Sequence, residues 1–254
     1  QGELMMLGAF GALALMSFGG LSFWLAAPVA VVGMMALGVL IERLVIRPIL
    51  GQPQFTVVML TIGLGYLCRG LITMLPGIGS ETNSLEVPYK GRVIDLGGAV
   101  ISVDQLIVIL ATAALCGLLY AMFRFSKIGI AMQASSQNQL AAYYMGIPVR
   151  RLNGLVWGLS AGVAALAGLL LAPITFVHVN MGFIGLKAFP AAVVGGFGSL
   201  PGAIVGGLTI GLVEALAGFY LPEGFKDIAA YVVVLVMLVV KPNGLFGGNA
   251  RKKV

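Results

Sequence analysis

Side chains that commonly do chemistry in proteins are scarce in this chain. It has one histidine, His178, and two cysteines, Cys68 and Cys116, whose spacing favours neither a metal site nor a disulfide framework. No Gly-x-x-x-x-Gly-Lys-Ser/Thr stretch occurs, so the chain has no phosphate-binding loop with which to use ATP by itself. We therefore expect no catalytic residue, no metal and no bound cofactor, and any energy source must be external.

Two ionisable residues attract attention because they interrupt apolar runs. Arg69 lies in the run 55–75, and Glu214 lies in the run 187–220. A charged group inside a membrane is costly, so it faces either a polar partner or a water-filled cavity. Both residues are thus candidates for a structural contact or for the lining of a solute route. Pairing of the two with one another is a further hypothesis, which predicts non-additive effects of their substitution.

The composition places the chain in a lipid bilayer. Of 254 residues, 59% are hydrophobic and 9% are charged, whereas soluble domains carry about 25% charged residues. A crossing helix needs about 20 apolar residues. The fold class is accordingly all-α: a polytopic helical membrane protein, one domain over 1–254, with about seven spanning or re-entrant helices. The expected segments are two in 4–41 with a turn near Gly19 and Gly20, then 55–75, 106–123, 152–172, 187–220 and 228–240.

The last two of these segments raise questions of length. A Gly-rich break, GGFGSLPG at 195–202, divides 187–220 and predicts either a short hairpin or a re-entrant element. Such backbone persists at membrane depth only where protein or a water-filled cavity surrounds it. Because the Gly-rich break could line such a cavity, it adds four candidates for the translocation pathway: Gly195, Gly196, Gly198 and Ser199.

The block 228–240 reaches spanning length if its helix begins at Pro222 or Glu223.

The loops alternate in charge. Basic residues dominate in three places: after the second apolar run, in the segment 124–151 and at the C-terminus. The one acid in these three places is Glu42, which follows the second run. Cytoplasmic loops are enriched in Lys and Arg, so these parts are expected in the cytoplasm and the loop 76–104 outside. Within that outer loop, apolar residues flank a Gly97-Gly98 pair and predict a small hairpin. It would serve as a lid or as a dock for an external partner.

The segment QNQLAAYYMGIPVRR, residues 137–151, is polar and lies between two apolar runs. Helix-compatible residues predict a short helix over 132–145, which Gly146 caps and Pro148 ends. The small side chains of Ala141 and Ala142 would let another protein approach the backbone. Tyr143, Tyr144 and Met145 would add contact area of the type enriched at interfaces.

At these residues the sequence resembles the permease subunits of branched-chain amino acid ABC importers, of the LivH type. Residues 140–146, LAAYYMG, follow the Glu-Ala-Ala-x-x-x-Gly motif of importer permeases, although position 140 is Leu rather than Glu. The resemblance implies a coupling helix that docks on the ATP-binding subunit. Further matches are GLKAF at 185–189, GGFGSLPGA at 195–203, KPNGLFG at 241–247 and QGEL at 1–4. The residues assigned to coupling are Leu140, Ala141, Ala142, Tyr143, Gly146 and Ile147.

The resemblance also implies a biological setting. It predicts a multi-pass protein of the bacterial inner membrane, with a cytoplasmic C-terminus, that imports leucine, isoleucine, valine or related small polar solutes. The family's first helix would precede Gln1 and is lacking here. Gly2 and Glu3 join the pathway candidates. The expected partners are a second related permease, two ATP-binding subunits that hold ATP and magnesium, a periplasmic substrate-binding protein and the lipid bilayer, with no nucleic acid.

Two other functions stay open. A self-sufficient ion-coupled transporter or channel would use Arg69, Glu214 or Lys187, but charge within the apolar runs is sparse. A membrane scaffold without transport would show no substrate-stimulated ATP hydrolysis in a reconstituted complex. Co-purification of an ATP-binding partner would favour the importer over a self-sufficient transporter.

Overall fold

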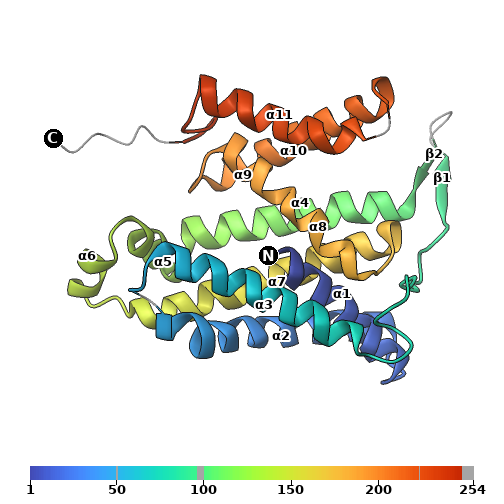
Figure 1. Ribbon diagram of the computed structural model, residues 1–254, viewed down its shortest axis with the longest axis horizontal. Coiled ribbons are helices and arrows are strands. Elements are labelled where there is room, and N and C mark those ends of the chain that lie inside the picture. Colours follow the sequence, from blue (N-terminus) through green and yellow to red (C-terminus); the bar gives the residue numbers. More distant parts are fainter. Residues whose placement is uncertain (50, 96–99, 223, 248–254) are drawn as a thin grey trace. The chain divides into compact units, whose positions relative to one another are not determined.

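The computed structural model describes residues 1–49, 51–95, 100–222 and 224–247. Helices dominate it (Figure 1). The residues form two compact units, Gln1–Phe183 and Ile184–Val254, and the single permease domain stays a prediction. Each unit is therefore described by itself.

The first unit holds most of the helices and a two-stranded sheet. Its elements are α1 (Gly2–Ser17), α2 (Phe23–Ile41), the π-helix η1 (Glu42–Ile46), the 3₁₀ helix η2 (Arg47–Ile49), α3 (Gln54–Thr73), β1 (Val93–Asp95), β2 (Val100–Ser102), α4 (Val103–Phe125), α5 (Lys127–Gln137), α6 (Gln139–Tyr144), α7 (Val149–Thr175) and the 3₁₀ helix η3 (Val179–Met181). Helix α8 (Gly182–Leu186) leads into the second unit, which contains α9 (Ala188–Gly195), α10 (Leu200–Tyr220) and α11 (Phe225–Val240).

The polytopic helical fold is confirmed. Among the described residues, five helical stretches are long and apolar enough to cross a membrane: Phe23–Ile49, Phe55–Thr73, Val103–Phe125, Val149–Thr175 and Leu200–Tyr220. Three shorter apolar stretches accompany them: Gly2–Ser17, Val179–Gly195 and Ile228–Val240. The first turn also lies where it was predicted, because α1 ends at Ser17 and Gly20 adopts a positive φ of 60° before α2 begins.

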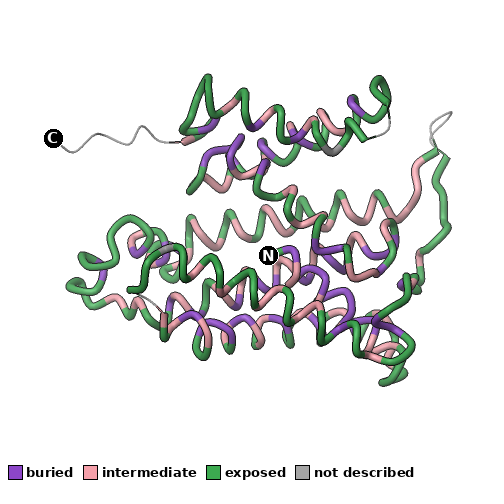
Figure 2. The backbone as a smooth tube through the Cα atoms, viewed as in Figure 1, coloured by how far each residue is buried: buried purple, intermediate pink, exposed green. Residues whose placement is uncertain are grey.

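The core of the first unit is built where α7 packs against α1 and α2. Glycines bring these backbones together: a Cβ on Gly8 of α1 would lie 2.4 Å from the Cα of Ala165, and one on Gly38 of α2 would lie 2.6 Å from the Trp157 carbonyl oxygen. In lipid, such close packing is what drives helices to associate. Burial is accordingly concentrated on α1 and α7, whereas α4 has no buried residue (Figure 2).

A small hairpin lies at one end of the first unit. Strands β1 and β2 pair antiparallel, with Val93 opposite Ser102 and Ile94 opposite Ile101, so the predicted hairpin is confirmed. Its predicted Gly97-Gly98 turn lies outside the described residues. The hairpin and α6 lie at opposite ends of the first unit (Figure 1). The loop charges assign α6 to the cytoplasmic side and the hairpin to the outer side of the membrane, and this separation is compatible with that assignment.

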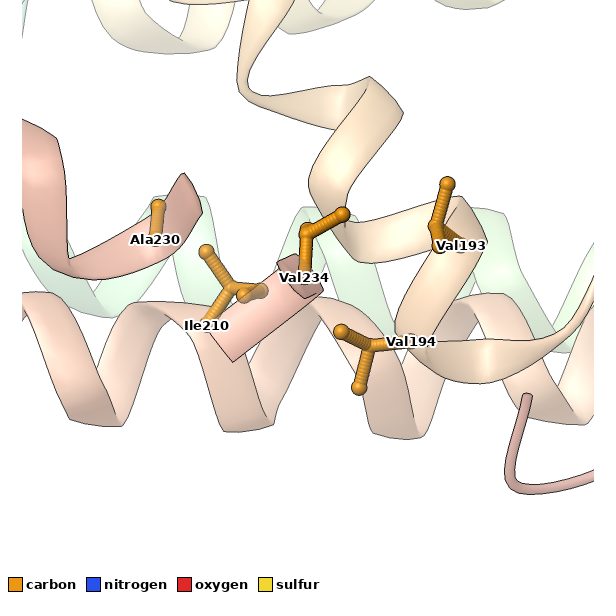
Figure 3. Packing of buried hydrophobic residues seen from close by; sticks show 5 residues of the cluster. All are labelled: Val193, Val194, Ile210, Ala230 and Val234. Carbon is orange, nitrogen blue, oxygen red and sulfur yellow. The ribbon is translucent and has the colours of Figure 1, made fainter. Parts of the chain in front are cut away.

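The second unit packs three helices around a small apolar cluster. Figure 3 shows its members converging from α9, α10 and α11: Val193, Val194, Ile210, Ala230 and Val234. Helix α11 begins at Phe225, after Gly224 with a φ of 96°. The predicted start at Pro222 is therefore wrong, and Glu223 lies outside the described residues. At 16 residues, α11 is about 24 Å long, which is less than the hydrocarbon thickness of about 30 Å.

The Gly-rich break forms the bend of an unequal helical hairpin. Helix α9 has 8 residues, about 12 Å, and cannot cross a bilayer by itself, whereas α10 has 21. The two helices touch backbone to backbone, because a Cβ on Gly195 would lie 2.0 Å from the Gly202 carbonyl oxygen. A chain segment after α11 then returns to α9, where the amides of Leu245 and Phe246 donate to the carbonyls of Val194 and Gly195 at 2.9 and 3.0 Å.

Candidate functional site

The polar segment between α4 and α7 folds as two helices rather than one. A single helix over 132–145 was predicted, but α5 ends at Gln137 and α6 begins at Gln139. Asn138 lies between them with extended backbone, and its side-chain oxygen accepts a hydrogen bond from the Ala141 amide at 3.0 Å. This is an N-cap, which starts a new helix and changes the chain direction. The prediction of a continuous helix is therefore wrong.

The end of α6 follows the prediction. Gly146 adopts a φ of 79°, a conformation that other residues rarely take. Its amide donates to the Tyr143 carbonyl and the Ile147 amide donates to the Ala142 carbonyl, each at 3.0 Å. These two bonds form a Schellman cap, which satisfies carbonyls that the helix leaves free. A short, rigid helix with fixed ends results, and α7 follows directly from Val149.

The surface of α6 is strongly apolar and exposed. Its four large side chains have exposed fractions of 64, 68, 77 and 82%: Leu140, Tyr143, Tyr144 and Met145, in that order. The two alanines differ from one another, because Ala141 is exposed whereas Ala142 is buried, with 4% of it exposed. The expectation that both alanines offer a bare surface to a partner is wrong for Ala142, which packs inside the chain's own fold.

Three of the predicted pathway residues come together in the first unit. A nitrogen of Arg69 (Nη2) donates to Glu3 Oε1 at 2.6 Å, and the guanidinium carbon lies 4.7 Å from the centre of the Phe183 ring. A Cβ on Gly2 would lie 2.0 Å from the Gly182 carbonyl oxygen, so glycine there lets α1 approach α8. The cluster joins α1, α3 and the start of α8. The second oxygen of Glu3 (Oε2) is buried without a hydrogen-bond partner among the described residues.

A cavity of about 200 Å³ adjoins this cluster. Glu3 contributes to its wall, together with aliphatic side chains such as Leu64 and Val156 and the hydroxyl-bearing Thr61 and Ser160. A mostly apolar wall with a few polar groups is typical of sites for small organic molecules. The cavity is therefore suited to a small solute with an apolar part and a charged part.

The hypothesis that Arg69 pairs with Glu214 concerns residues of different units, and each of the two has another partner within its own unit. Arg69 is paired with Glu3, and a Glu214 oxygen (Oε1) lies 3.2 Å from the Lys187 ammonium within the second unit. Each ion pair offsets part of the cost of a charge in apolar surroundings. The original hypothesis rested on the scarcity of charged partners within the apolar runs, and it overlooked Glu3 in the first turn of α1.

We expect strong energetic coupling between Arg69 and Glu3. The single changes Arg69→Gln and Glu3→Gln each leave a half-buried charge without its partner, so the double change should cost less than the sum of the two. The interaction energy should be about 1–3 kcal/mol, measured by thermal unfolding of the purified protein. The cycle of Arg69→Gln with Glu214→Gln is the matched control, and additive losses are expected there. Additivity in the Arg69–Glu3 cycle would contradict the pairing.

The other pathway candidates lie in the second unit, and several of them have contacts that hold its helices together. Gly195 touches α10, as described above, and a Cβ on Gly196 would lie 2.6 Å from the Gly247 amide nitrogen. The Ser199 hydroxyl accepts a hydrogen bond from the Gly202 amide at 3.1 Å and so caps α10. Gly198 has a φ of 87° and no heavy atom within 4 Å of the position that a Cβ would take. A role of these residues in a pathway stays a prediction.

One pair of residues was missed in the sequence. Glu42 is buried and its carboxylate is held by Arg47 through two hydrogen bonds, of 3.2 and 2.9 Å. The sequence shows Glu42 as the single acid in a basic loop, which is the signal that could have found the pair. No group of three or more His, Cys, Asp or Glu side chains within the described parts of the chain is arranged to hold a metal ion.

The chain is similar to a known protein family and to several individual proteins. Residues 1–241 match the family described as "Branched-chain amino acid transport system / permease component", a match that includes residues of both units. The chain is 30% identical to the high-affinity branched-chain amino acid transport system permease protein LivH of Escherichia coli K12, over all of this chain and 86% of the relative. It is 29% identical to the permease protein BraD of Pseudomonas aeruginosa, over all of this chain and 87% of that relative.

A relative from an archaeon extends the comparison. The chain is 28% identical to a probable branched-chain amino acid transport permease protein LivH of Methanocaldococcus jannaschii, over 99% of this chain and 83% of the relative. No solved structure matches the chain significantly.

Proposed function

Because this chain belongs to the family of permease components of branched-chain amino acid transport systems, we propose that it carries branched-chain amino acids, or related small polar solutes, across the bacterial inner membrane. The membrane-crossing helices and the family support a multi-pass permease of an ABC transport system. The transported solute would be leucine, isoleucine or valine, as in the names of the relatives.

The observation that carries the proposal is the surface of α6. Its exposed Tyr143, Tyr144 and Met145 lie on a helix fixed by an N-cap and a Schellman cap, at the end of the unit opposite the β1–β2 hairpin. Large apolar residues exposed outside the membrane-crossing helices are typical of an interface. The partner proposed for this surface is an ATP-binding subunit, which would bind ATP and magnesium. A complete complex would contain two such subunits, a second related permease and a periplasmic substrate-binding protein.

The proposed route passes the cavity beside Glu3 and Arg69. Closure of the ATP-binding subunits would displace α6, and the helices attached to it would tilt so that a site between paired permeases opens to alternate sides. The Glu3–Arg69 pair has no net charge when both groups are ionised, which suits a zwitterionic amino acid better than a bare ion. The aliphatic wall of the cavity suits a branched side chain.

Reconstitution tests the proposal. The chain would be purified with the second permease, the ATP-binding subunits and the binding protein, placed in liposomes, and assayed for uptake of labelled leucine and valine together with ATP hydrolysis. Uptake that requires both ATP and the binding protein is the expected result. Uptake driven by an ion gradient without ATP would establish the self-sufficient transporter instead. ATP hydrolysis that no solute stimulates, with no uptake, would favour a scaffold.

The proposed orientation has a direct test. With Cys68 and Cys116 replaced, a single cysteine at Tyr144 should react with a membrane-impermeant thiol reagent only after the cytoplasmic side is opened. A cysteine at Val93 in the hairpin should react in intact cells from which the outer membrane has been removed. Both residues are exposed in the chain by itself, with fractions of 77 and 64%, so in cells that lack the ATP-binding subunits access is limited by the membrane alone. The reverse pattern would place α6 outside and contradict its docking on an ATP-binding subunit.

A further inference from the structure

Glu42 is the one charged residue that is fully buried in the described part of the chain, with 1% of its side chain exposed. Arg47 holds it with a fork of two bonds, from Nε to Oε1 at 3.2 Å and from Nη2 to Oε2 at 2.9 Å. Burial of a carboxylate is tolerated only with such a partner, because an unpaired buried charge is strongly destabilising. The carboxylate and the guanidinium therefore fix one another's position.

The backbone between the two residues is shaped for this pairing. In an α-helix, residues five apart point about 140° away from one another. Here the chain forms a π-helix over Glu42–Ile46, and the Arg47 amide donates to the Glu42 carbonyl. This wider turn brings position 47 back above position 42. Single π-turns of this kind are frequently found at functional sites.

The pair also reaches the coupling segment. Arg47 Nη2 donates to the carbonyl oxygen of Arg150 at 3.2 Å, in the first turn of α7 and four residues after Gly146, which caps α6. On its other side the carboxylate faces Gly154, where a Cβ would lie 3.4 Å from Glu42 Oε2. The end of α2 and the beginning of α7 are thus joined through one ion pair next to α6.

Close packing continues from the Glu42–Arg47 ion pair along α2 and α7. A Cβ on Gly158 would lie 2.9 Å from Val39 Cγ2, and one on Gly162 would lie 2.6 Å from Met35 Cγ. Helices packed at such distances have little room to slide without losing contacts. A displacement of the first turn of α7 is therefore passed to α2.

We propose that Glu42 and Arg47 are positioning residues that make α2 move together with α6 and α7 when a partner displaces α6. This inference rests on the proposed function, because it assigns a role in transmitting the movement that ATP binding causes. Without this ion pair, α6 and the first turn of α7 would move while α2 stayed in place. ATP would then be hydrolysed without the full movement of the membrane-crossing helices that import requires.

The decisive variant replaces the ion pair by apolar residues, Glu42→Leu with Arg47→Met. Exchange of a buried ion pair for apolar side chains of similar size is often tolerated or stabilising, so the complex should assemble. The bond to the Arg150 carbonyl is lost. In the reconstituted complex, we expect solute-stimulated ATP hydrolysis to persist while the number of solutes imported per ATP falls at least about fivefold, within the usual range of coupling between sites.

Two comparisons keep the inference open to refutation. Arg43→Gln, an exposed arginine of the same turn, should leave the ratio of import to hydrolysis at the wild-type value. Arg47→Lys keeps the charge but not the fork of hydrogen bonds, and it should lower the ratio partly, which serves as the test if the apolar pair does not assemble. A wild-type ratio in either Arg47 variant would overturn the inference. Absence of import or of stimulated hydrolysis in the wild-type complex would instead refute the proposed function.

Discussion

Replacement of Ala141 by arginine or by glutamate should lower co-purification of the ATP-binding subunits at least about tenfold, equivalent to about 1.4 kcal/mol of binding free energy. Ala141 is the exposed alanine at the centre of α6, between Leu140 and the two tyrosines. A long side chain there holds a partner away from the helix backbone whatever its charge. Residues at the centre of an interface commonly contribute this much.

The neighbouring alanine provides the contrast. Ala142 is buried in the chain's own fold, so Ala142→Arg should disturb folding as well as docking, seen as a broadened or lost peak in size-exclusion chromatography. Val100→Glu, on the hairpin at the opposite end of the unit, is the matched control with 67% of its side chain exposed in the native protein. Normal co-purification is expected for it. Full binding by both Ala141 variants would show that α6 is not the docking surface.

Replacement of Gly206 by alanine should destabilise the second unit by about 1–3 kcal/mol, the usual cost of overpacking, or by more. The added Cβ would lie 2.1 Å from the Ala191 carbonyl oxygen and 2.7 Å from the Gly195 amide nitrogen. These are backbone atoms of α9 that cannot turn aside as a flexible side chain would. The two helices must separate, and the loss should appear as a lower temperature of thermal unfolding in detergent.

The next residue along the chain is the control. Gly207 has no heavy atom within 4 Å of the position that a Cβ would take, and alanine favours a helix over glycine by about 1 kcal/mol. Gly207→Ala should therefore keep or raise the unfolding temperature. Equal losses at both positions would mean that helix propensity, rather than contact between α9 and α10, sets the stability of this hairpin.

The sequence allowed the membrane helices, the hairpin and the cap at Gly146 to be predicted, because each depends on local signals. Apolar run length, turn glycines and the stop at Pro148 are read within a few residues of where they act. The break between α5 and α6 at Asn138 was not predicted, although asparagine is a good N-cap residue, because the residues on both sides of it are compatible with one continuous helix. Burial of Ala142 depends on how α6 rests on the rest of the unit, which no local pattern reports.

The charged contacts were the least predictable part. Glu3 and Arg69 are 66 positions apart in sequence, and only the packing of α1 against α3 brings them together. Glu42 and Arg47 escape a search at helical spacing because a π-turn joins them. In both cases tertiary structure or an unusual turn determines which residue is the partner. The sequence shows only that a charge in an apolar environment needs a partner.

The segment after α11 returns to α9, and this contact determines when the second unit can finish folding. The carbonyls of Val194 and Gly195 receive their hydrogen bonds from Leu245 and Phe246, which the ribosome adds about fifty residues later, after α10 and α11 have been synthesised. Until then these carbonyls need water or another donor, and unpaired polar backbone is costly in lipid. The second unit is thus completed late in synthesis, once Leu245 and Phe246 have bonded to the end of α9.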